Sequence, residues 1–193
     1  MRLHWRLSGL LLLVTALFAI ITPLLISSVP ALAGAPAWSP AAERPAWHSL
    51  PLTDARTGQA FTLADLAGKT VYVEPMATWC TNCRQQMGVI RDQLLSRLDP
   101  ERTVLLGLSV ETDLPRETLA TYVDDQGFSW TFAVMTPELL QALSSQFGLT
   151  ITNPTAVPHF VIGPDGATSD LSTGFHSSDQ LLGELTAAGS MSQ

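Results

Sequence analysis

The sequence predicts an α/β domain in which helices cover both faces of a central mixed β-sheet. Segments with the composition of strands and helices alternate along most of the chain after residue 48, which is typical of a sheet layered between helices. Near the end, a Gly-Pro-Asp-Gly turn at residues 163–166 joins two short apolar segments. Because so short a turn connects antiparallel strands, we expect an antiparallel pair in the sheet.

The first half of this domain contains two segments that read as buried strands. Residues 70–76 (TVYVEPM) and 103–110 (TVLLGLSV) are rich in β-branched and other apolar side chains. Between them, residues 80–98 carry apolar side chains at helical spacing. A shorter strand is expected at residues 61–63. The order strand, helix, strand predicts a βαβ unit with parallel strands.

The second half predicts three more helices and one more short extended segment. A helix over residues 115–126 precedes the extended residues 130–134. The next helix, over residues 137–147, has Thr136 as its N-cap and a proline at its first position. After the turn-linked pair of short strands, residues 177–189 form the last helix. Helices of this number and spacing suffice to cover both faces of the sheet.

The N-terminal region differs in composition from the rest of the chain. Residues 1–33 start with basic residues, continue as a long apolar run and end in Ala-Leu-Ala, which is the pattern of a secretory signal peptide. The run is also close to the length of a membrane span, so cleavage after Ala33 and retention as an N-terminal anchor are alternatives. Either one predicts an extracytoplasmic location. Residues 34–47, rich in Ala and Pro, are expected to form a tether to the domain of residues 48–193.

The charge of the chain argues against nucleic acid as a partner. The formal net charge is −7, and all 17 acidic residues follow residue 33. The sequence contains no stripe of basic residues and no basic patch interleaved with aromatic residues, which are the usual signs of nucleic-acid binding. An acidic domain is consistent with an exported protein.

Cys80 and Cys83 are the only cysteines, and their spacing indicates a redox pair. A disulfide that closes so small a loop removes little entropy from the unfolded chain, so a purely structural bridge is disfavoured. Cys80 falls where a strand gives way to a helix, and unpaired N–H groups at a helix N-terminus favour the thiolate. We therefore expect Cys80 to be the exposed nucleophile and Cys83, one turn later and deeper, to be the resolving thiol. Trp79 would shield the pair and help to present it.

These motifs resemble a known family. The string WCTNC after a strand, the string VPHFVIGPDG about 75 residues later and the order of strands and helices are similar to those of thioredoxin-fold thiol-disulfide oxidoreductases of the extracytoplasmic TlpA, ResA and CcmG type. The resemblance covers about residues 48–188. It implies a thioredoxin-like three-layer sandwich, a redox-active Cys80–Cys83 disulfide and no cofactor.

The resemblance also assigns roles outside the cysteine pair. Pro158 stands where this family has a cis-proline beside the disulfide, which would expose the backbone of Val157 to substrate. Trp79 and Gly174 are likewise assigned to substrate binding, the glycine because it lets a partner chain lie close. Glu74 lies where thioredoxins bury an acid that accepts the proton of the resolving cysteine.

Three features depart from the family pattern. Pro75 interrupts a central strand, where proline removes a hydrogen-bond donor, so a bulge is expected there. The dipeptide Thr81-Asn82 between the cysteines lacks both the proline of common reducing members and the histidine of strongly oxidising ones. His159 replaces the small hydroxyl residue that usually follows the proline. The direction of electron flow therefore stays open.

The preferred hypothesis is an enzyme that reduces disulfides in exported proteins, with apocytochrome c or the copper-site thiols of oxidase assembly as candidate substrates. It would act as a monomer and be recharged by a membrane electron donor. The alternatives are an oxidase that forms disulfides, and a Cu(I) or zinc carrier that uses both cysteines with His159 or His176. A peroxidase is disfavoured, because Cys83 would attack an oxidised Cys80 at once. The preferred hypothesis assigns no metal ligand.

Overall fold

The computed structural model describes residues 44–190. The predicted leader (residues 1–33) and most of the predicted tether lie outside the described residues. The strands are β1 (Leu52–Thr53), β2 (Ala60–Phe61), β3 (Thr70–Met76), β4 (Thr103–Ser109), β5 (Thr131–Val134) and β6 (Phe160–Ile162), and the α-helices are α2 (Thr81–Val89), α3 (Arg116–Asp125), α4 (Pro137–Phe147) and α5 (Ser178–Ser190). Within this part of the chain, no helix has the length and apolar character needed to cross a membrane.

Shorter helical turns complete the described structure. A π-helical turn η3 (Ile90–Leu94) and a 3₁₀ turn η4 (Leu95–Arg97) continue α2 along the segment predicted as one long helix. The remaining 3₁₀ turns are η1 (Ala46–Ser49), η2 (Leu63–Leu66), η5 (Leu149–Thr152) and η6 (Pro154–Ala156).

The central sheet is mixed, as predicted. Its strand order is β5-β4-β3-β6; β3, β4 and β5 run parallel, and β6 pairs antiparallel with β3. β1 and β2 form a separate antiparallel pair. The expected partner strand after the Gly-Pro-Asp-Gly turn is reduced to single bridges from His159 to Ser172 and from Ile162 to Thr168.

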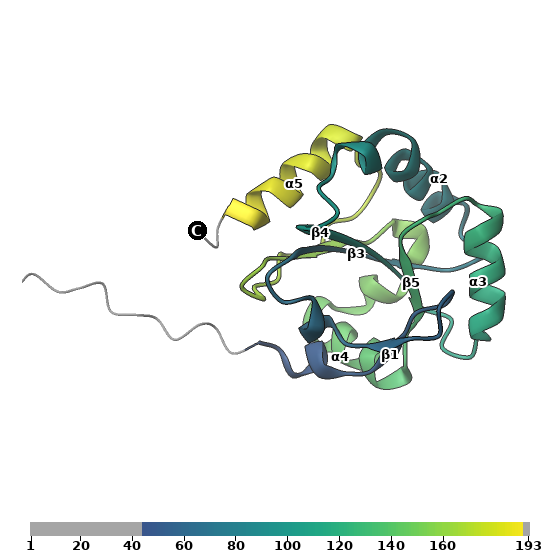
Figure 1. Ribbon diagram of the computed structural model, residues 1–193. Coiled ribbons are helices and arrows are strands. Elements are labelled where there is room, and N and C mark those ends of the chain that lie inside the picture. Colours follow the sequence, from purple (N-terminus) through teal and green to yellow (C-terminus); the bar gives the residue numbers. More distant parts are fainter. Residues whose placement is uncertain (1–43, 191–193) are drawn as a thin grey trace, which may run out of the picture. The chain divides into compact units, whose positions relative to one another are not determined.

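Helices cover both faces of the sheet, which confirms the predicted layers. Figure 1 shows α2 and α5 on one side of the strands, and α4 with β1 on the other. Every residue of β3 is buried, as expected for a strand covered on both faces. Val71 and Val73 pack in the apolar core that includes α4, whereas Tyr72 packs with side chains of η3 and α5. By the alternation along a strand, Glu74 shares the face of Tyr72.

The predicted bulge at Pro75 is wrong. β3 pairs with β4 in unbroken register through Met76, and Pro75 lies opposite Leu108. On the other side, β6 pairs only with Val71 to Val73 of β3. β6 begins at Phe160, opposite Val73, and so does not extend along β3 as far as Pro75. No strand on that side therefore needs a hydrogen bond from the missing N–H of the proline, and β3 stays regular.

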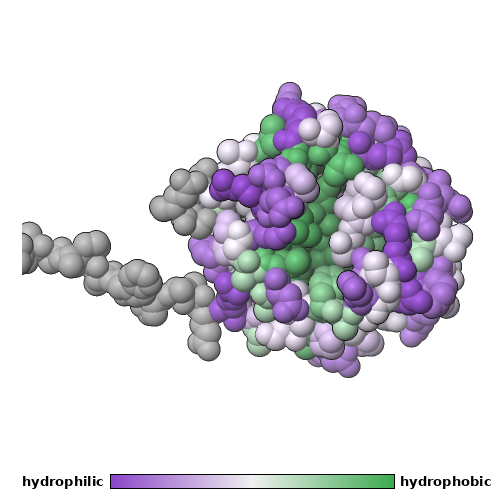
Figure 2. Space-filling view, in the orientation of Figure 1, coloured by the Kyte–Doolittle hydropathy of each residue, from purple (hydrophilic) through white to green (hydrophobic). Residues whose placement is uncertain are grey.

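The surface carries an apolar pocket at the amino ends of the parallel strands, away from the cysteines. Figure 2 shows apolar residues gathered in a hollow between polar margins. One pocket is lined by residues at the amino ends of β4 and β5 and by η4, among them Leu95, Leu98, Leu105 and Trp130. Cys80 instead follows the carboxyl end of the parallel strand β3. This pocket is therefore separate from the cysteine site.

Candidate active site

Cys80 and Cys83 form a disulfide at the start of α2, where the chain leaves β3. Cys80 is the N-cap of α2, and the N–H of Cys83 donates a hydrogen bond to Cys80 Sγ at 3.1 Å. The disulfide joins Cα atoms 5.4 Å apart. The predicted pairing and its place at a helix N-terminus are both present. Such a pair can cycle between disulfide and dithiol, with the helix N-terminus favouring the Cys80 thiolate in the reduced form.

The expectation that Cys80 is exposed is wrong for this oxidised state. Cys80 is 1% exposed and Cys83 is fully buried. The apolar side chains packed with them in one cluster are Ala55, Met76, Ala77, Met87, Leu119, Val123, Phe128 and Phe132. Trp79, directly before Cys80, is 60% exposed. An incoming thiolate reaches the disulfide only when some of the covering groups move.

The loop that contains η6 lies against the cysteine pair. Cys83 Sγ is 3.1 Å from the carbonyl oxygen of Pro154, which is placed to accept its S–H bond in the reduced protein. Asn82 Nδ2 donates a hydrogen bond of 2.8 Å to the carbonyl of Thr155. The N–H of Gly174 donates a bond of 2.8 Å to the carbonyl of Ala156. The structure thus brings the predicted Gly174 segment to the same loop.

The predicted cis-proline is not found. The described peptide bonds include no cis bond, so Pro158 follows a trans peptide. Val157 ends η6 in the left-handed region, at φ 50° and ψ 56°, and its N–H donates to the carbonyl of Pro154 at 2.9 Å. Val157 is buried and its N–H is already bonded within the loop, so this N–H is not free to pair with a substrate strand in this state.

Glu74 is buried beneath the sheet face that α2 and α5 cover, and is 1% exposed. Tyr72 Oη donates a hydrogen bond of 3.0 Å to Glu74 Oε2, while Oε1 has no partner among the described residues. Burial raises the pKa of Glu74 to about 8, although the bond from Tyr72 opposes the shift. Glu74 therefore has the burial and the pKa that a proton acceptor for a thiol requires.

Glu111 holds the segment that leads into the cysteines, a role the sequence did not reveal. Its Oε2 accepts a hydrogen bond of 2.6 Å from the N–H of Thr78, and its Oε1 accepts one of 3.1 Å from the Thr78 hydroxyl. The Ser109 hydroxyl donates to the same carboxylate at 3.2 Å. Glu111 follows β4, so it fixes the turn between β3 and α2 from the neighbouring strand.

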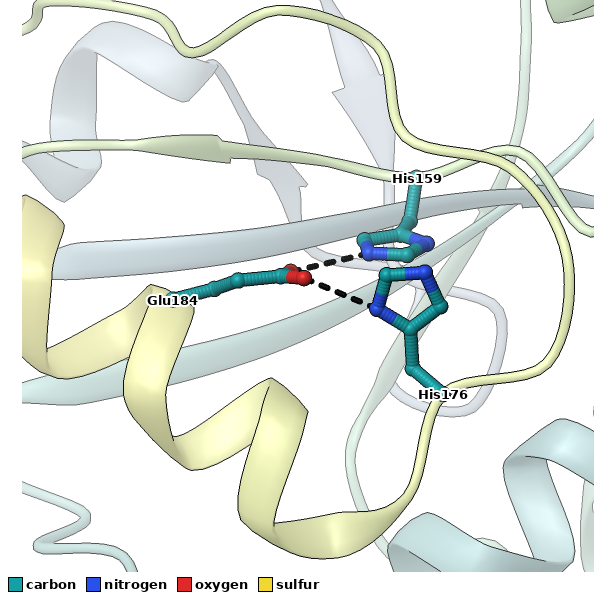
Figure 3. A group of neighbouring side chains, drawn as sticks. All are labelled: His159, His176 and Glu184. Atoms are coloured by element: carbon teal, nitrogen blue, oxygen red, sulfur yellow. Dashed lines mark hydrogen bonds and ion pairs between the residues drawn. The ribbon is translucent and has the colours of Figure 1, made fainter.

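His159 pairs with Glu184 on α5. Its Nε2 lies 2.9 Å from Glu184 Oε2, and Nδ1 of His176 lies 2.8 Å from Glu184 Oε1 (Figure 3). Burial lowers the pKa of His159, and the carboxylate of Glu184 opposes that shift. His176, named above as a possible ligand beside the cysteines, is held by Glu184 in this group. Among the described residues, the group of possible metal ligands that contains both histidines includes neither cysteine.

The comparisons with known proteins agree on the fold. No protein-family model and no curated protein matches the sequence. Among solved structures, a thiol:disulfide interchange protein of the thioredoxin family from Chlorobium tepidum TLS matches with TM-score 0.57 and 25% identity over 72% of this chain and 93% of that one. BsSco, of the Sco family of cytochrome c oxidase assembly proteins, matches with TM-score 0.60 and 15% identity over 74% and 92%.

A third solved structure is a secreted disulfide oxidoreductase of Mycobacterium tuberculosis that is homologous to DsbE of E. coli. It matches with TM-score 0.52 and 17% identity over 72% of this chain and 95% of that one. These likenesses establish the fold, and the cysteine pair at the start of α2 supplies the chemistry. The thioredoxin fold and the Cys80–Cys83 disulfide together make this chain a thioredoxin-like thiol-disulfide oxidoreductase.

Proposed function

We propose that this oxidoreductase reduces disulfides in exported proteins, outside the cytoplasm. The observation that carries the direction is the engagement of His159 with Glu184. A histidine near the nucleophile makes a pair more oxidising when its positive charge stabilises the thiolate. Here burial lowers the pKa of His159 and favours the neutral ring, and the hydrogen bond described for Cys80 Sγ comes from one backbone N–H. The Cys80 thiolate is therefore stabilised by the helix N-terminus without help from a charged His159, which supports the assignment as a reductant.

The proposed reaction moves two electrons from the dithiol to a substrate disulfide. The Cys80 thiolate attacks one substrate sulfur, the substrate S–S bond breaks, and a substrate thiolate leaves. Cys83 then loses its proton to the Glu74 carboxylate and attacks Cys80 Sγ. The mixed disulfide breaks, the second substrate thiolate departs, and the Cys80–Cys83 disulfide forms. Because a pKa of about 8 is close to that of a free thiol, the proton transfer from Cys83 to Glu74 costs little.

The proposed setting follows from the leader and the similar proteins. A signal peptide or membrane anchor at residues 1–33 would place the domain outside the cytoplasm. Two of the similar structures are described as a secreted disulfide oxidoreductase and an oxidase assembly protein. We propose thiols of cytochrome c or oxidase assembly as substrates of a monomeric enzyme, and a membrane electron donor that reduces the Cys80–Cys83 disulfide again.

A redox titration of the full chain tests the direction. The Cys80–Cys83 pair is equilibrated with thiol-disulfide buffers of known potential, and its oxidised fraction is measured by thiol alkylation. We expect a midpoint reduction potential of about −270 mV, as in thioredoxin. A midpoint reduction potential of about −120 mV, as in the strong oxidant DsbA, would overturn the proposal and make the protein an oxidase.

Partner trapping tests the substrate class. The Cys83→Ser variant keeps the nucleophile but cannot resolve a mixed disulfide, so it should accumulate covalent complexes with exported thiol proteins through Cys80. Cys80→Ser is the matched control and should trap none. Equal trapping by both variants would remove Cys80 from its assigned role. The absence of exported partners from the Cys83→Ser complexes would contradict the proposed substrates.

A further inference from the structure

A second group of reactive side chains lies outside the cysteine pair. His159 precedes β6, His176 precedes α5, and Glu184 lies on α5. One nitrogen or oxygen atom of each lies within 4.8 Å of those of the other two. Figure 3 shows the Glu184 side chain extending from α5 toward the two imidazole rings, both of which face its carboxylate. The proposed disulfide chemistry uses none of these three side chains as a reactant.

The donor set is that of a metal site. Two imidazole nitrogens and one carboxylate oxygen are ligands that Zn²⁺ commonly takes in proteins. The two rings have centroids 4.6 Å apart and planes inclined by 85°, so they meet edge to face and are not stacked. Each ring therefore presents one nitrogen to the same small region beside Glu184. Small side-chain adjustments would bring the three donors to a common distance of about 2 Å from a central ion.

His159 supplies a second, independent observation. Its side chain is 1% exposed, and its Nδ1 has no hydrogen bond of normal geometry. Burial lowers the pKa of this ring, and the backbone of Val157 is among the smaller influences that oppose the shift. A metal ion on Nε2 would leave the proton of the neutral ring on Nδ1. Histidine ligands of metals usually donate their second N–H to a backbone or carboxylate acceptor, and the Val157 backbone is a candidate for that role.

The surroundings hold the site and leave it open on one side. The side chain of Gln86 accepts a bond of 2.8 Å from the N–H of His176 and donates one of 3.0 Å to its carbonyl oxygen, which fixes the loop. The side chains of His176 and Glu184 are 19% and 31% exposed. Three protein ligands with a solvent-facing side leave room for water or a small ligand in the fourth position.

We propose that His159 Nε2, His176 Nδ1 and the Glu184 carboxylate bind one divalent metal ion of the Zn²⁺ type, separately from the cysteine pair. The ion would take the place of the hydrogen atom between each ring nitrogen and the carboxylate, and each neutral ring would then carry its one proton on the nitrogen that faces away from the ion. No change in oxidation state is involved. The site contains no sulfur ligand, so it differs from a carrier site on Cys80 and Cys83 and does not depend on the direction of the disulfide reaction.

A zinc titration of the full chain in its oxidised form tests the proposal. The disulfide keeps both cysteines from binding, so competition with a chromophoric chelator reports the other donors alone. We expect one equivalent of Zn²⁺ per chain, and we expect His176→Ala and Glu184→Gln each to weaken the affinity at least about ten-fold. Asp179→Asn, an exposed carboxylate on the same helix, is the matched control and should bind as the parent does. His176 is tested instead of His159 because it is less buried.

A cobalt titration gives a second readout that does not depend on affinity. Co²⁺ in the oxidised chain should show the visible absorption of a low-coordinate nitrogen and oxygen site, without a thiolate charge-transfer band. The visible absorption should be lost in His176→Ala while the far-ultraviolet circular dichroism stays that of the parent. Absence of binding up to about 100 µM zinc, a low affinity for an assembled site of three ligands, would overturn the proposal. Parent-like zinc affinity in both site variants would also overturn it.

Discussion

The phenol of Tyr72 donates a hydrogen bond to Glu74 Oε2 at 3.0 Å, buried between the sheet and the helices that cover it, and the second carboxyl oxygen has no partner among the described residues. The two residues lie on the same face of β3, two positions apart. One hydrogen bond does not compensate for the loss of water around a carboxylate, so burial raises the pKa of Glu74 to about 8. This relationship couples the stability of the fold, and the proposed proton transfer from Cys83, to pH.

Replacement of Glu74 by Gln should remove the part of the pH dependence of the free energy of unfolding that the titration of Glu74 causes. The unfolded chain loses the Glu74 proton near 4.5, whereas the folded chain keeps it until about 8. Between these values the folded state holds the extra proton, so this residue makes the free energy of unfolding fall as pH rises through the window and level off above it. The parent should lose on the order of a few kcal/mol relative to Glu74→Gln between pH 5 and pH 9.

Urea unfolding of the oxidised proteins at both pH values measures this difference. Glu101→Gln, at an exposed position, is the control and should change with pH as the parent does. A constant gap between the parent and Glu74→Gln at pH 5 and pH 9 would contradict the assignment of a raised pKa. In the reduced protein, Glu74→Gln should also slow the release of mixed disulfides, because Cys83 loses its proton acceptor.

Replacement of Tyr72 by Phe should raise the pKa of Glu74 further and destabilise the fold. The hydroxyl is the hydrogen bond that lowers this pKa, and its loss leaves both carboxyl oxygens unsatisfied. We expect a cost of about 1–3 kcal/mol, the usual penalty for a buried polar group without a partner. Infrared measurement of the Glu74 carboxyl band against pH, together with urea unfolding, reports both effects.

Tyr122 offers a matched control for this substitution. Its hydroxyl is also buried, but it has no hydrogen-bond partner among the described residues. Tyr122→Phe removes an unsatisfied group, so the change should be close to neutral or stabilising. Equal destabilisation by Tyr72→Phe and Tyr122→Phe would show that lost packing, and not the bond to Glu74, accounts for the effect.

The sequence predicted those parts of the fold and site that depend on local patterns. The apolar content of residues 70–76 and 103–110 identified the two central strands, and the cysteine spacing after a strand placed the disulfide at a helix start. The expected burial of Glu74 followed from the resemblance to thioredoxins. In each case the information lies within a few residues of the feature or in a family motif.

The features that were missed or wrong depend on contacts between distant segments. His159 pairs with Glu184, 25 residues later on another element, and no local pattern links the two. The peptide bond of Pro158 is trans, and Val157 before it lies in the left-handed region at the end of η6. The burial of Cys80 arises from side chains that several elements contribute. Such contacts appear only once the chain is folded.

Glu111 should matter for the cysteine pair, although it touches neither sulfur. It accepts hydrogen bonds from the N–H and the hydroxyl of Thr78, two residues before Cys80. Glu111→Gln replaces a charge-assisted bond by a weaker neutral one, and the amide must turn one N–H away from Thr78. We expect a loss of about 1–2 kcal/mol in stability and a slower disulfide exchange per folded molecule.

Asp113→Asn is the control, because Asp113 is an exposed acid two residues along the chain. It should match the parent in unfolding by urea and in the rate of disulfide exchange with a small-molecule disulfide. If Glu111→Gln also matches the parent in both, the bonds to Thr78 contribute nothing to the position of the cysteines.

Two glycines should respond to alanine in opposite directions. Gly174 has φ +90°, where a Cβ is unfavourable, although no atom lies within 4 Å of the position that the methyl group would take. Gly174→Ala should therefore cost about 1–2 kcal/mol through backbone strain alone. Gly183 lies within α5, also with open space around it, and Gly183→Ala should gain about 0.5–1 kcal/mol. Urea unfolding measures both changes in stability, and a parent-like stability of Gly174→Ala would contradict the backbone strain.

The rate of exchange with a protein disulfide, corrected for the folded fraction, tests whether Gly174 contacts substrate. A rate that is lowered for Gly174→Ala but not for Gly183→Ala would support the assignment of Gly174 to substrate binding. Equal rates for the two variants would show that Gly174 serves only as a turn residue.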